Sequence, residues 1–387
     1  MEMSVKRFSV AMMAAAGNAA ETTNAAENRK LDPTGEVKLR QAGQDGVRKY
    51  RIPGIAGTTK GTLIAVYDMR RYPIGDLPSD IDVGMSRSTD GGRTWAPMKV
   101  IMDMGNDPKW NYDGIGDPCI AVDRKRGTIW VAALWSHGDR GFHGSGPGLE
   151  PEETGQVMLV RSDDDGKTWS DPINITKQIK DPKWRLIMAS PGRGMTMEDG
   201  TLVMPAQFKN EENMPHSTIM WSRDDGTTWT FGNGAKPDTT ECRVVELGDG
   251  RLMLNMRDNR GGYRSVYTTK DLGKTWQVHP TSRKALIEPV CNAGLIRVKG
   301  SENVTGKDLL IFCNPNSQSE RSHITLKVSL DEGMTWPKQH WLLIDEGRSW
   351  CYSSLCRIDK ETIGVLHESS RADICFRRVK ITDLLER

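Results

Sequence analysis

The sequence is poor in the features that mark membrane proteins, polyanion-binding proteins and disulfide-rich proteins. No apolar run is long enough to span a bilayer. The 53 Lys and Arg residues nearly balance the 51 Asp and Glu residues, and the net charge of +2 gives no reason to expect a nucleic-acid partner. The seven cysteines are odd in number and show no CxxC or Cys/His spacing, which argues against a disulfide framework and a structural zinc site.

A short repeated phrase is the most informative feature that the chain does have. The phrase Ser/Thr-x-Asp-x-Gly-x-Thr-Trp occurs five times, and we call it the Asp-box turn. The Asp and Ser/Thr side chains can fold back onto backbone N–H groups, Gly can supply a positive φ, and Trp can bury an apolar face beside the turn. We therefore interpret the phrase as structural rather than catalytic. Its copies begin at Ser88, Ser162, Ser222, Thr269 and Ser329.

A second repeat, a turn followed by an apolar strand, occurs six times. The first five copies each precede one Asp-box turn, whereas the sixth is followed only by one strand-like run at 374–381. A six-bladed β-propeller whose last blade lacks the turn explains this count, so the sequence predicts an all-β fold with few helical residues outside the N-terminal tail. The six copies begin at Gly61, Gly127, Gly200, Gly250, Lys307 and Glu361.

The N-terminal segment is predicted to lie outside the propeller. Lys6 and Arg7 precede an apolar run at 8–16, and small residues follow at 17–19, as in a secretory signal peptide. A frayed tail or a non-native extension is the alternative. Residues 21–38 are polar and are interpreted as a linker. We therefore assign 1–38 to a signal-like segment or disordered tail and 39–387 to the propeller, and we expect a periplasmic or secreted monomer.

Charged residues embedded in apolar, strand-like contexts are candidates for a functional site, because the inner strands of a propeller converge on a central pocket. Arg51 lies in Tyr-Arg-Ile-Pro, Arg257 follows the apolar run that begins at Leu252, and Arg321 precedes a strand at 323–329. A closed ring can bring the three arginines together, and three guanidinium groups would bind a carboxylate strongly. For any one of them alone, a solvated or salt-bridged surface role is the alternative.

The Tyr-Arg-Ile-Pro phrase, combined with the series of Asp-box turns, resembles the sialidases (neuraminidases), specifically the bacterial exo-α-sialidases of glycoside hydrolase family 33. The similarity covers about 39–385, and the segments 253–262 and 345–353 are most similar to enzymes of gut Bacteroidetes. The resemblance implies a sialidase-like propeller and a retaining hydrolase of terminal sialic acid on glycans, glycoproteins or glycolipids. It implies no metal and no organic cofactor. From the chain length we expect no appended carbohydrate-binding module.

The resemblance assigns roles to five residues that suit this reaction. Arg51, Arg257 and Arg321 match the three arginines that bind the substrate carboxylate. Tyr352 matches the nucleophile, and Glu241 matches the glutamate that partners it. A neutral phenol avoids the repulsion that a carboxylate nucleophile would meet near the substrate carboxylate, and sialidases are an exception to the two-carboxylate scheme. The phenol needs a base, which Glu241 can supply.

Three further residues match the family on the acid/base side of the site. Asp76, twelve residues before the first Asp-box turn, matches the acid/base, which protonates the leaving oxygen. Arg70 matches an arginine near the acid/base loop, and Asp117 resembles a residue that lines the glycerol or N-acetyl side. Asp80 and Asp82 lie in the same loop, so the identity of the acid stays open, although the spacing favours Asp76. Each of these residues, taken alone, fits a turn or strand-edge role.

Two other functions stay open at this point. A trans-sialidase or an intramolecular trans-sialidase would use the same residues and would differ in its acceptor and its pocket aromatics. A non-catalytic propeller lectin or assembly factor with Asp-box turns would be expected to lack Tyr352, Glu241 or Asp76. All three are present, which makes this alternative the weaker one.

Overall fold

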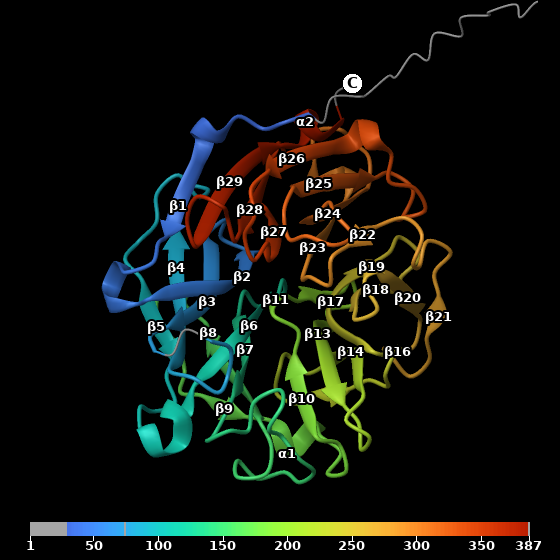
Figure 1. The fold of residues 1–387 in the computed structure, drawn as a ribbon. Coiled ribbons are helices and arrows are strands. Elements are labelled where there is room, and N and C mark those ends of the chain that lie inside the picture. Colours follow the sequence, from blue (N-terminus) through green and yellow to red (C-terminus); the bar gives the residue numbers. More distant parts are fainter. Residues whose placement is uncertain (1–28, 73–74, 386–387) are drawn as a thin grey trace, which may run out of the picture.

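The computed structural model describes residues 29–72 and 75–385, and it confirms the all-β, six-bladed propeller (Figure 1). The predicted signal-like segment, up to residue 28, lies outside the described residues. In each of the first two blades, strands follow one another from the axis to the rim by antiparallel pairing. Blade 1 contains β2 (Lys49–Gly57), β3 (Leu63–Arg70), β4 (Ile81–Ser88) and β5 (Lys99–Met102), and blade 2 contains β6 (Ile115–Val122), β7 (Ile129–Trp135), β8 (Gln156–Ser162) and β9 (Ile173–Asn174).

Blades 3 and 4 repeat this order, with a small two-stranded sheet beside blade 4. Blade 3 contains β10 (Leu186–Ala189), β12 (Met195–Thr196), β13 (Leu202–Lys209), β14 (Pro215–Ser222), β15 (Thr230–Phe231) and β16 (Lys236–Pro237). Blade 4 contains β17 (Thr239–Glu246), β18 (Leu252–Asp258), β20 (Ser265–Thr269) and β21 (Gln277–Val278), and the small sheet pairs β19 (Gly262–Tyr263) with β22 (Ile287–Glu288).

Blades 5 and 6 complete the ring. Among the described residues, the α-helices are α1 (Thr176–Ile179) and α2 (Ile381–Leu385), and none of the described helices is long and apolar enough to cross a membrane. Blade 5 contains β23 (Gly294–Val298), β24 (Leu309–Pro315), β25 (Ile324–Ser329) and β26 (Trp341–Asp345), and blade 6 contains β27 (Ser353–Arg357), β28 (Thr362–His367), β29 (Ile374–Lys380) and β1 (Glu36–Arg40).

The outermost strand of blade 6 comes from the other end of the chain. Strand β1 pairs antiparallel with β29, so the blue N-terminal strand lies beside the red C-terminal one in Figure 1. Glu36 accepts hydrogen bonds from Arg371 at 2.7 and 2.8 Å and from Arg377 at 2.9 Å. The last blade therefore closes the ring without a strand of its own at the rim. The predicted domain start at residue 39 falls inside β1, three residues after the strand begins.

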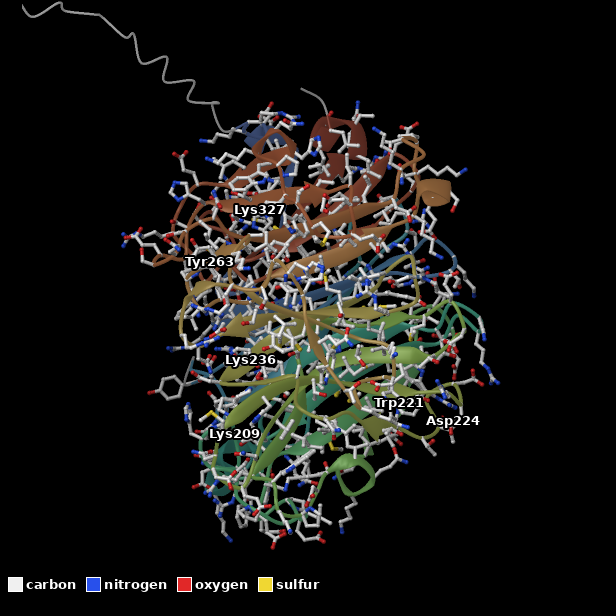
Figure 2. All side chains as sticks on the ribbon, turned by 90° about the vertical axis from the view of Figure 1, so that its right-hand side faces the viewer. Lys209, Trp221, Asp224, Lys236, Tyr263 and Lys327 are labelled. Atoms are coloured by element: carbon white, nitrogen blue, oxygen red, sulfur yellow. The ribbon has the colours of Figure 1, made fainter. Side chains whose placement is uncertain are left out.

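The Asp-box turns join the third and fourth strands of the first five blades. In blade 3, Asp224 accepts hydrogen bonds from the Ser222 hydroxyl at 2.8 Å, and from the backbone N–H and hydroxyl of Thr228 at 2.8 and 2.6 Å. Figure 2 shows Asp224 at one end of this blade and Lys209, on the neighbouring strand, toward the other. The turns are thus structural, and they lie at the opposite end of the blades from the Lys209 end of β13.

Replacing Asp224 with alanine should therefore lower stability without changing catalysis. Losing three hydrogen bonds to one carboxylate is expected to cost about 1–2 kcal/mol, because the site is exposed to water. Urea unfolding measures this cost. Asp225→Asn is the matched control, since it removes the surface ion pair with Arg126, tolerates the φ of 61° at this position, and should change stability by less than about 1 kcal/mol. A tenfold fall in kcat/KM for Asp224→Ala would contradict a purely structural role.

The inner segment of blade 3 leaves its own sheet at one point and pairs with blade 2 near the propeller axis. β10 and β12 pair with β13, but between them β11 (Gly192–Arg193) pairs in parallel with β6 of blade 2. Gly192 has a φ of +124°, which a side chain would strain. A Cβ atom on Gly54, in blade 1, would lie only 2.5 Å from the Gly192 carbonyl oxygen. The backbone of β11 is thus packed closely at the centre of the ring.

Candidate active site

One end of the propeller axis opens into a cavity of about 580 Å³. The inner strands of the blades begin at this end, and irregular backbone positions there aim side chains into the cavity. The antiparallel pairing of β2 with β3 shifts register after Arg51, that of β6 with β7 shifts around Asp117, and that of β17 with β18 shifts around Glu241. Bulges of this kind redirect side chains and are common beside active sites. The lining includes Asp76, Asp117, Glu241, Arg257 and Tyr352.

Tyr352 and Glu241 form the central contact of the cavity. The Tyr352 hydroxyl donates a hydrogen bond of 2.5 Å to Glu241, and Arg257 donates to the other Glu241 oxygen at 2.7 Å and to the Tyr352 hydroxyl at 3.0 Å. Burial and the charge of Glu241 raise the pKa of Tyr352 well above its ordinary value. Against the opposing effect of burial, the charge of Arg257 and the hydrogen bonds lower the pKa of Glu241. The proton therefore rests on the phenol, and the carboxylate is free to accept it.

The other two arginines of the predicted triad also lie against Tyr352. The guanidinium carbons of Arg51 and Arg321 lie 5.0 and 5.7 Å from the centre of the Tyr352 ring. Arg51 is held by a bond of 3.0 Å from its Nε to Glu368, and the same carboxylate accepts the backbone N–H of Tyr352 at 3.0 Å. Arg321 donates to the carbonyl of Val290 at 2.8 Å. The structure thus brings three guanidinium groups around one phenol.

Asp76 lies on the exposed side of the cavity, beside two arginines. Its Oδ1 accepts from Arg70 at 2.7 Å and lies 3.5 Å from Arg51. Against the opposing effect of burial, the charges of Arg70 and Arg51 lower the pKa of Asp76. Asp80 and Asp82, the alternatives for the acid, instead form ion pairs with Arg71, and neither is among the residues that line the cavity. The geometry therefore favours Asp76 as the proposed acid/base.

Asp117 and Asp68 form a pair of carboxyl groups at the base of the cavity. The backbone N–H of Asp117 donates to Asp68 at 2.8 Å, and Arg70 donates to the other Asp68 oxygen at 2.8 and 3.1 Å. Burial and the negative charges of Asp68 and Glu241 raise the pKa of Asp117 well above its ordinary value. Asp117 therefore keeps its proton to a higher pH than an ordinary aspartate, and in its protonated form it can donate a hydrogen bond to a bound molecule.

Asp117→Asn is expected to stabilise the protein increasingly as the pH rises. An unfolded Asp117 loses its proton near pH 3.9, whereas the folded one retains it to a higher pH, so the wild type loses stability as the pH rises above that value. The asparagine cannot ionise, and it tolerates the φ of 58° at this position. Urea unfolding at pH 4 and pH 7 measures the difference. A stability gain no larger at pH 7 than at pH 4 would show that Asp117 ionises normally.

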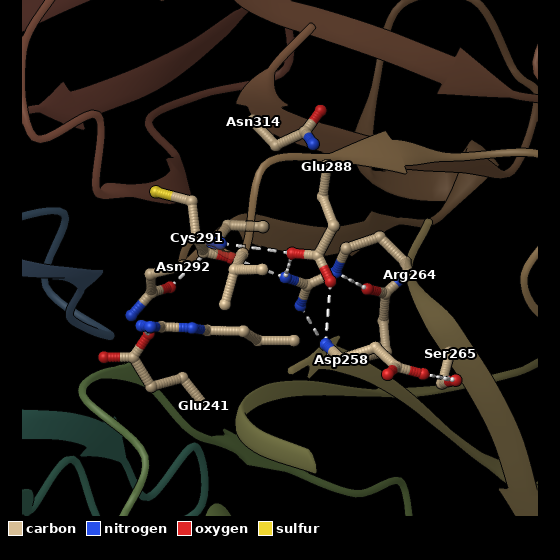
Figure 3. A network of polar contacts seen from close by, with 12 residues as sticks. Glu241, Asp258, Arg264, Ser265, Glu288, Cys291, Asn292 and Asn314 are labelled. Atoms are coloured by element: carbon tan, nitrogen blue, oxygen red, sulfur yellow. Dashed lines mark hydrogen bonds and ion pairs between the residues drawn. The ribbon is translucent and has the colours of Figure 1, made fainter. Parts of the chain in front are cut away.

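Figure 3 shows a buried ion pair between Arg264 and Glu288, which supports the segments beside two of the three arginines. Arg264 and Glu288 are fully buried and meet at 2.8 Å. The second Glu288 oxygen accepts the backbone N–H of Asp258 at 2.7 Å, which fixes the residue next to Arg257. Arg264 also donates to the carbonyl of Cys291 at 2.6 Å, beside the Val290 carbonyl that holds Arg321. The pair therefore ties the Arg257 strand to the loop that supports Arg321.

Sequence reasoning missed four residues that position this site. Glu368 and Asp68 stand at or near the ends of apolar runs, so the criterion of a charge in a strand-like context could have found them. Glu288 also stands in an apolar run, Ala-Leu-Ile-Glu-Pro-Val, so the same criterion could have found it, whereas Arg264 lies just after the polar, glycine-rich segment 258–262 and carried no such signal. The described residues contain no group of three His, Cys, Asp or Glu side chains that could hold a metal ion.

Comparisons with known proteins agree on one family. The BNR repeat-like domain matches residues 52–360. A sialidase of Bacteroides fragilis is 52% identical, over 90% of this chain and 65% of that protein. A sialidase of Micromonospora viridifaciens is 33% identical, over 86% of this chain and 52% of that protein. The chain thus spans between about half and two thirds of the length of these curated relatives.

Solved structures show the same likeness. Hadza microbial sialidase Hz136 superposes with a TM-score of 0.87 at 52% identity, over 90% of this chain and 69% of that one. An intramolecular trans-sialidase from Ruminococcus gnavus superposes with a TM-score of 0.76 at 18% identity, over 91% of this chain and 99% of that one. The second likeness is one of fold alone.

Proposed function

Since the chain belongs to the sialidase family of BNR repeat-like propellers, we propose that it is a retaining exo-α-sialidase that removes terminal sialic acid from glycoconjugates. The observation that carries the proposal is the Tyr352 phenol, hydrogen-bonded to a Glu241 carboxylate and surrounded by the guanidinium groups of Arg51, Arg257 and Arg321. An anionic sugar suits this arrangement, because the arginines can hold its carboxylate while a neutral nucleophile approaches the neighbouring carbon.

The first proposed step forms a tyrosyl-enzyme. The Tyr352 oxygen attacks the anomeric carbon while its proton passes to Glu241, and the glycosidic C–O bond breaks as Asp76 protonates the leaving oxygen. In the second step Asp76 removes a proton from water, whose oxygen displaces Tyr352, and Glu241 returns the proton to the phenolate. Two displacements retain the configuration of the anomeric carbon.

The substrate itself prepares Asp76 for its role as an acid. In the free protein, Arg70 and Arg51 keep this carboxyl group ionised. A substrate carboxylate bound to Arg51 neutralises one of those charges and adds a negative charge nearby, and both effects raise the pKa of Asp76. Substrate binding and protonation of the acid are therefore coupled in this proposal.

The test is the product formed from a sialoside. Turnover of an α-linked aryl sialoside, followed by proton NMR from the first minute, should show free sialic acid appearing first as the α anomer. An initial β anomer would overturn the retaining mechanism. No turnover, together with tight binding of the intact glycan, would instead support a lectin.

Transfer rather than hydrolysis is the second candidate, because trans-sialidases would use the same residues. The same NMR experiment, repeated with lactose as acceptor, distinguishes the two. A sialylated lactose product would identify transfer to an external acceptor, and an anhydro sugar would identify intramolecular transfer. We propose hydrolysis, so free sialic acid should remain the main product with lactose present.

A further inference from the structure

A second cavity, of about 400 Å³, lies at the other end of the propeller axis. The active-site residues stand at the beginnings of the inner strands, whereas this cavity is lined where the same strands end, including Gly57 of β2 and Val122 of β6. An eight-residue strand such as β6 separates its two ends by roughly 23 Å. The second cavity is therefore remote from Tyr352, and we call it the far-end cavity.

Packed backbone separates the two cavities along the axis. The parallel strand β11 crosses the centre of the ring, where a Cβ atom on Gly192 would collide with the Arg243 guanidinium. The Asn292 amide donates to the carbonyl of Pro191 at 3.4 Å from the side of blade 5. Arg243 is buried and donates to the carbonyl of Cys242 at 2.8 Å. A molecule in the far-end cavity is thus distinct from one in the active site.

Three arginines converge on the far-end cavity from three blades. Arg193 follows the central glycine of β11 and donates to the carbonyl of Leu355 in blade 6 at 3.2 Å. Arg124 and Arg357 extend from the ends of β6 and β27, and both lie near one oxygen of Glu302, at 3.7 and 3.8 Å. These distances are longer than hydrogen bonds. Most N–H groups of the three guanidiniums are thus available to an added acceptor.

The charge of this cluster is only partly compensated. Within residues 29–72 and 75–385, Glu302 is the one carboxylate within 4 Å of the three guanidiniums, so three positive charges face one negative charge. Burial and the nearby charges of Arg124 and Arg357 lower the pKa of Arg193 to about 10. Crowded like charges are unfavourable, and an anion placed among them relieves that repulsion.

We propose that the far-end cavity is a binding site for a small oxyanion, a carboxylate or a phosphate, held by Arg124, Arg193 and Arg357. A guanidinium presents paired N–H donors that match two oxygens of such a group. Arg193, the most enclosed of the three, provides the central contact. Arg124 and Arg357 have side chains 48% and 38% exposed, so they can close on the ligand from the rim.

The test is calorimetric titration with inorganic phosphate and with citrate at constant ionic strength. The protein is first saturated with a dehydrated sialic acid analogue, which occupies the active-site arginines. The wild type should bind one anion, and Arg193→Gln should weaken that binding about tenfold or more, because it removes a charge-assisted contact. The matched control is Arg223→Gln, an exposed arginine in the Asp-box turn of blade 3, which should bind like the wild type.

Each result has a defined meaning. Tighter binding of citrate identifies a carboxylate site, and tighter binding of phosphate identifies a phosphate site. Arg357→Gln provides a second variant, and the thermal midpoint without anion shows whether either variant is misfolded. Equal affinities in the wild type, Arg193→Gln and Arg357→Gln would overturn the proposal, as would the absence of binding heat for both anions. The comparison with the variants assigns the binding heat to the far-end cavity. This outcome therefore does not depend on whether the analogue binds or the protein cleaves sialosides.

Discussion

Replacing Tyr352 with phenylalanine should lower kcat on an aryl sialoside by about a thousandfold or more, the scale of loss seen when an enzymatic nucleophile is removed. The substitution deletes the oxygen that donates to Glu241 and receives a bond from Arg257. It keeps the aromatic ring against Arg51 and Arg321, so the carboxylate pocket should survive. We therefore expect a small change in KM beside the large fall in kcat, measured by steady-state fluorogenic assay.

The matched control is Tyr267→Phe, which makes the same chemical change in the third strand of blade 4, away from the residues that line the cavity. It should keep kcat within about twofold, since surface changes away from special features are usually small. If Tyr352→Phe retained near wild-type kcat, a tyrosyl intermediate would be excluded. An equal loss in both variants would instead indicate general damage to the fold.

The sequence repeats made the propeller predictable, but one strand could not be predicted from local sequence patterns. Five Asp-box turns and six turn-strand units fix the number of blades, because each phrase specifies its own turn through contacts within about eight residues. The rim strand of blade 6 is different. Glu36 and its neighbours form β1 only through pairing with β29, more than 330 residues away in sequence. The segment Glu-Val-Lys-Leu-Arg does alternate polar and apolar residues, but it is short and continues a polar tail, so its first three residues, 36–38, are predicted as linker.

The residues of the site also differ in whether local sequence patterns could identify them. Arg51, Asp76 and Tyr352 stand in short phrases with recognisable spacing, and the fold brings them together, with the Arg51 guanidinium 5.0 Å from the Tyr352 ring and 3.5 Å from Asp76. Glu368 lies outside every phrase, yet it holds both Arg51 and the Tyr352 backbone. Its role arises from where β28 ends relative to β2 and β27, which is a property of the closed ring. Supporting groups of this kind depend on tertiary geometry, so local sequence does not specify them.

Glu288→Gln should destabilise the protein by about 3–5 kcal/mol. This is the largest loss of stability that we expect when one charged residue of this chain is replaced by an uncharged one. The change leaves the Arg264 guanidinium fully buried without its carboxylate partner, and an uncompensated buried charge is costly. Urea unfolding measures the loss. The surface variant Glu320→Gln is the matched control, because its pair with Arg348 is exposed and should contribute less than about 1 kcal/mol.

The double variant Arg264→Gln with Glu288→Gln separates lost charge balance from lost packing. With both charges removed, two neutral amides occupy the site, so the double variant should be more stable than Glu288→Gln alone. Additive losses from the two single variants would instead show that hydrogen bonds and shape, rather than the ion pair, hold the segment together. Because Glu288 fixes the Asp258 backbone beside Arg257, a folded Glu288→Gln protein should also show a raised KM. An unchanged KM would mean that the Arg257 strand keeps its position without this anchor.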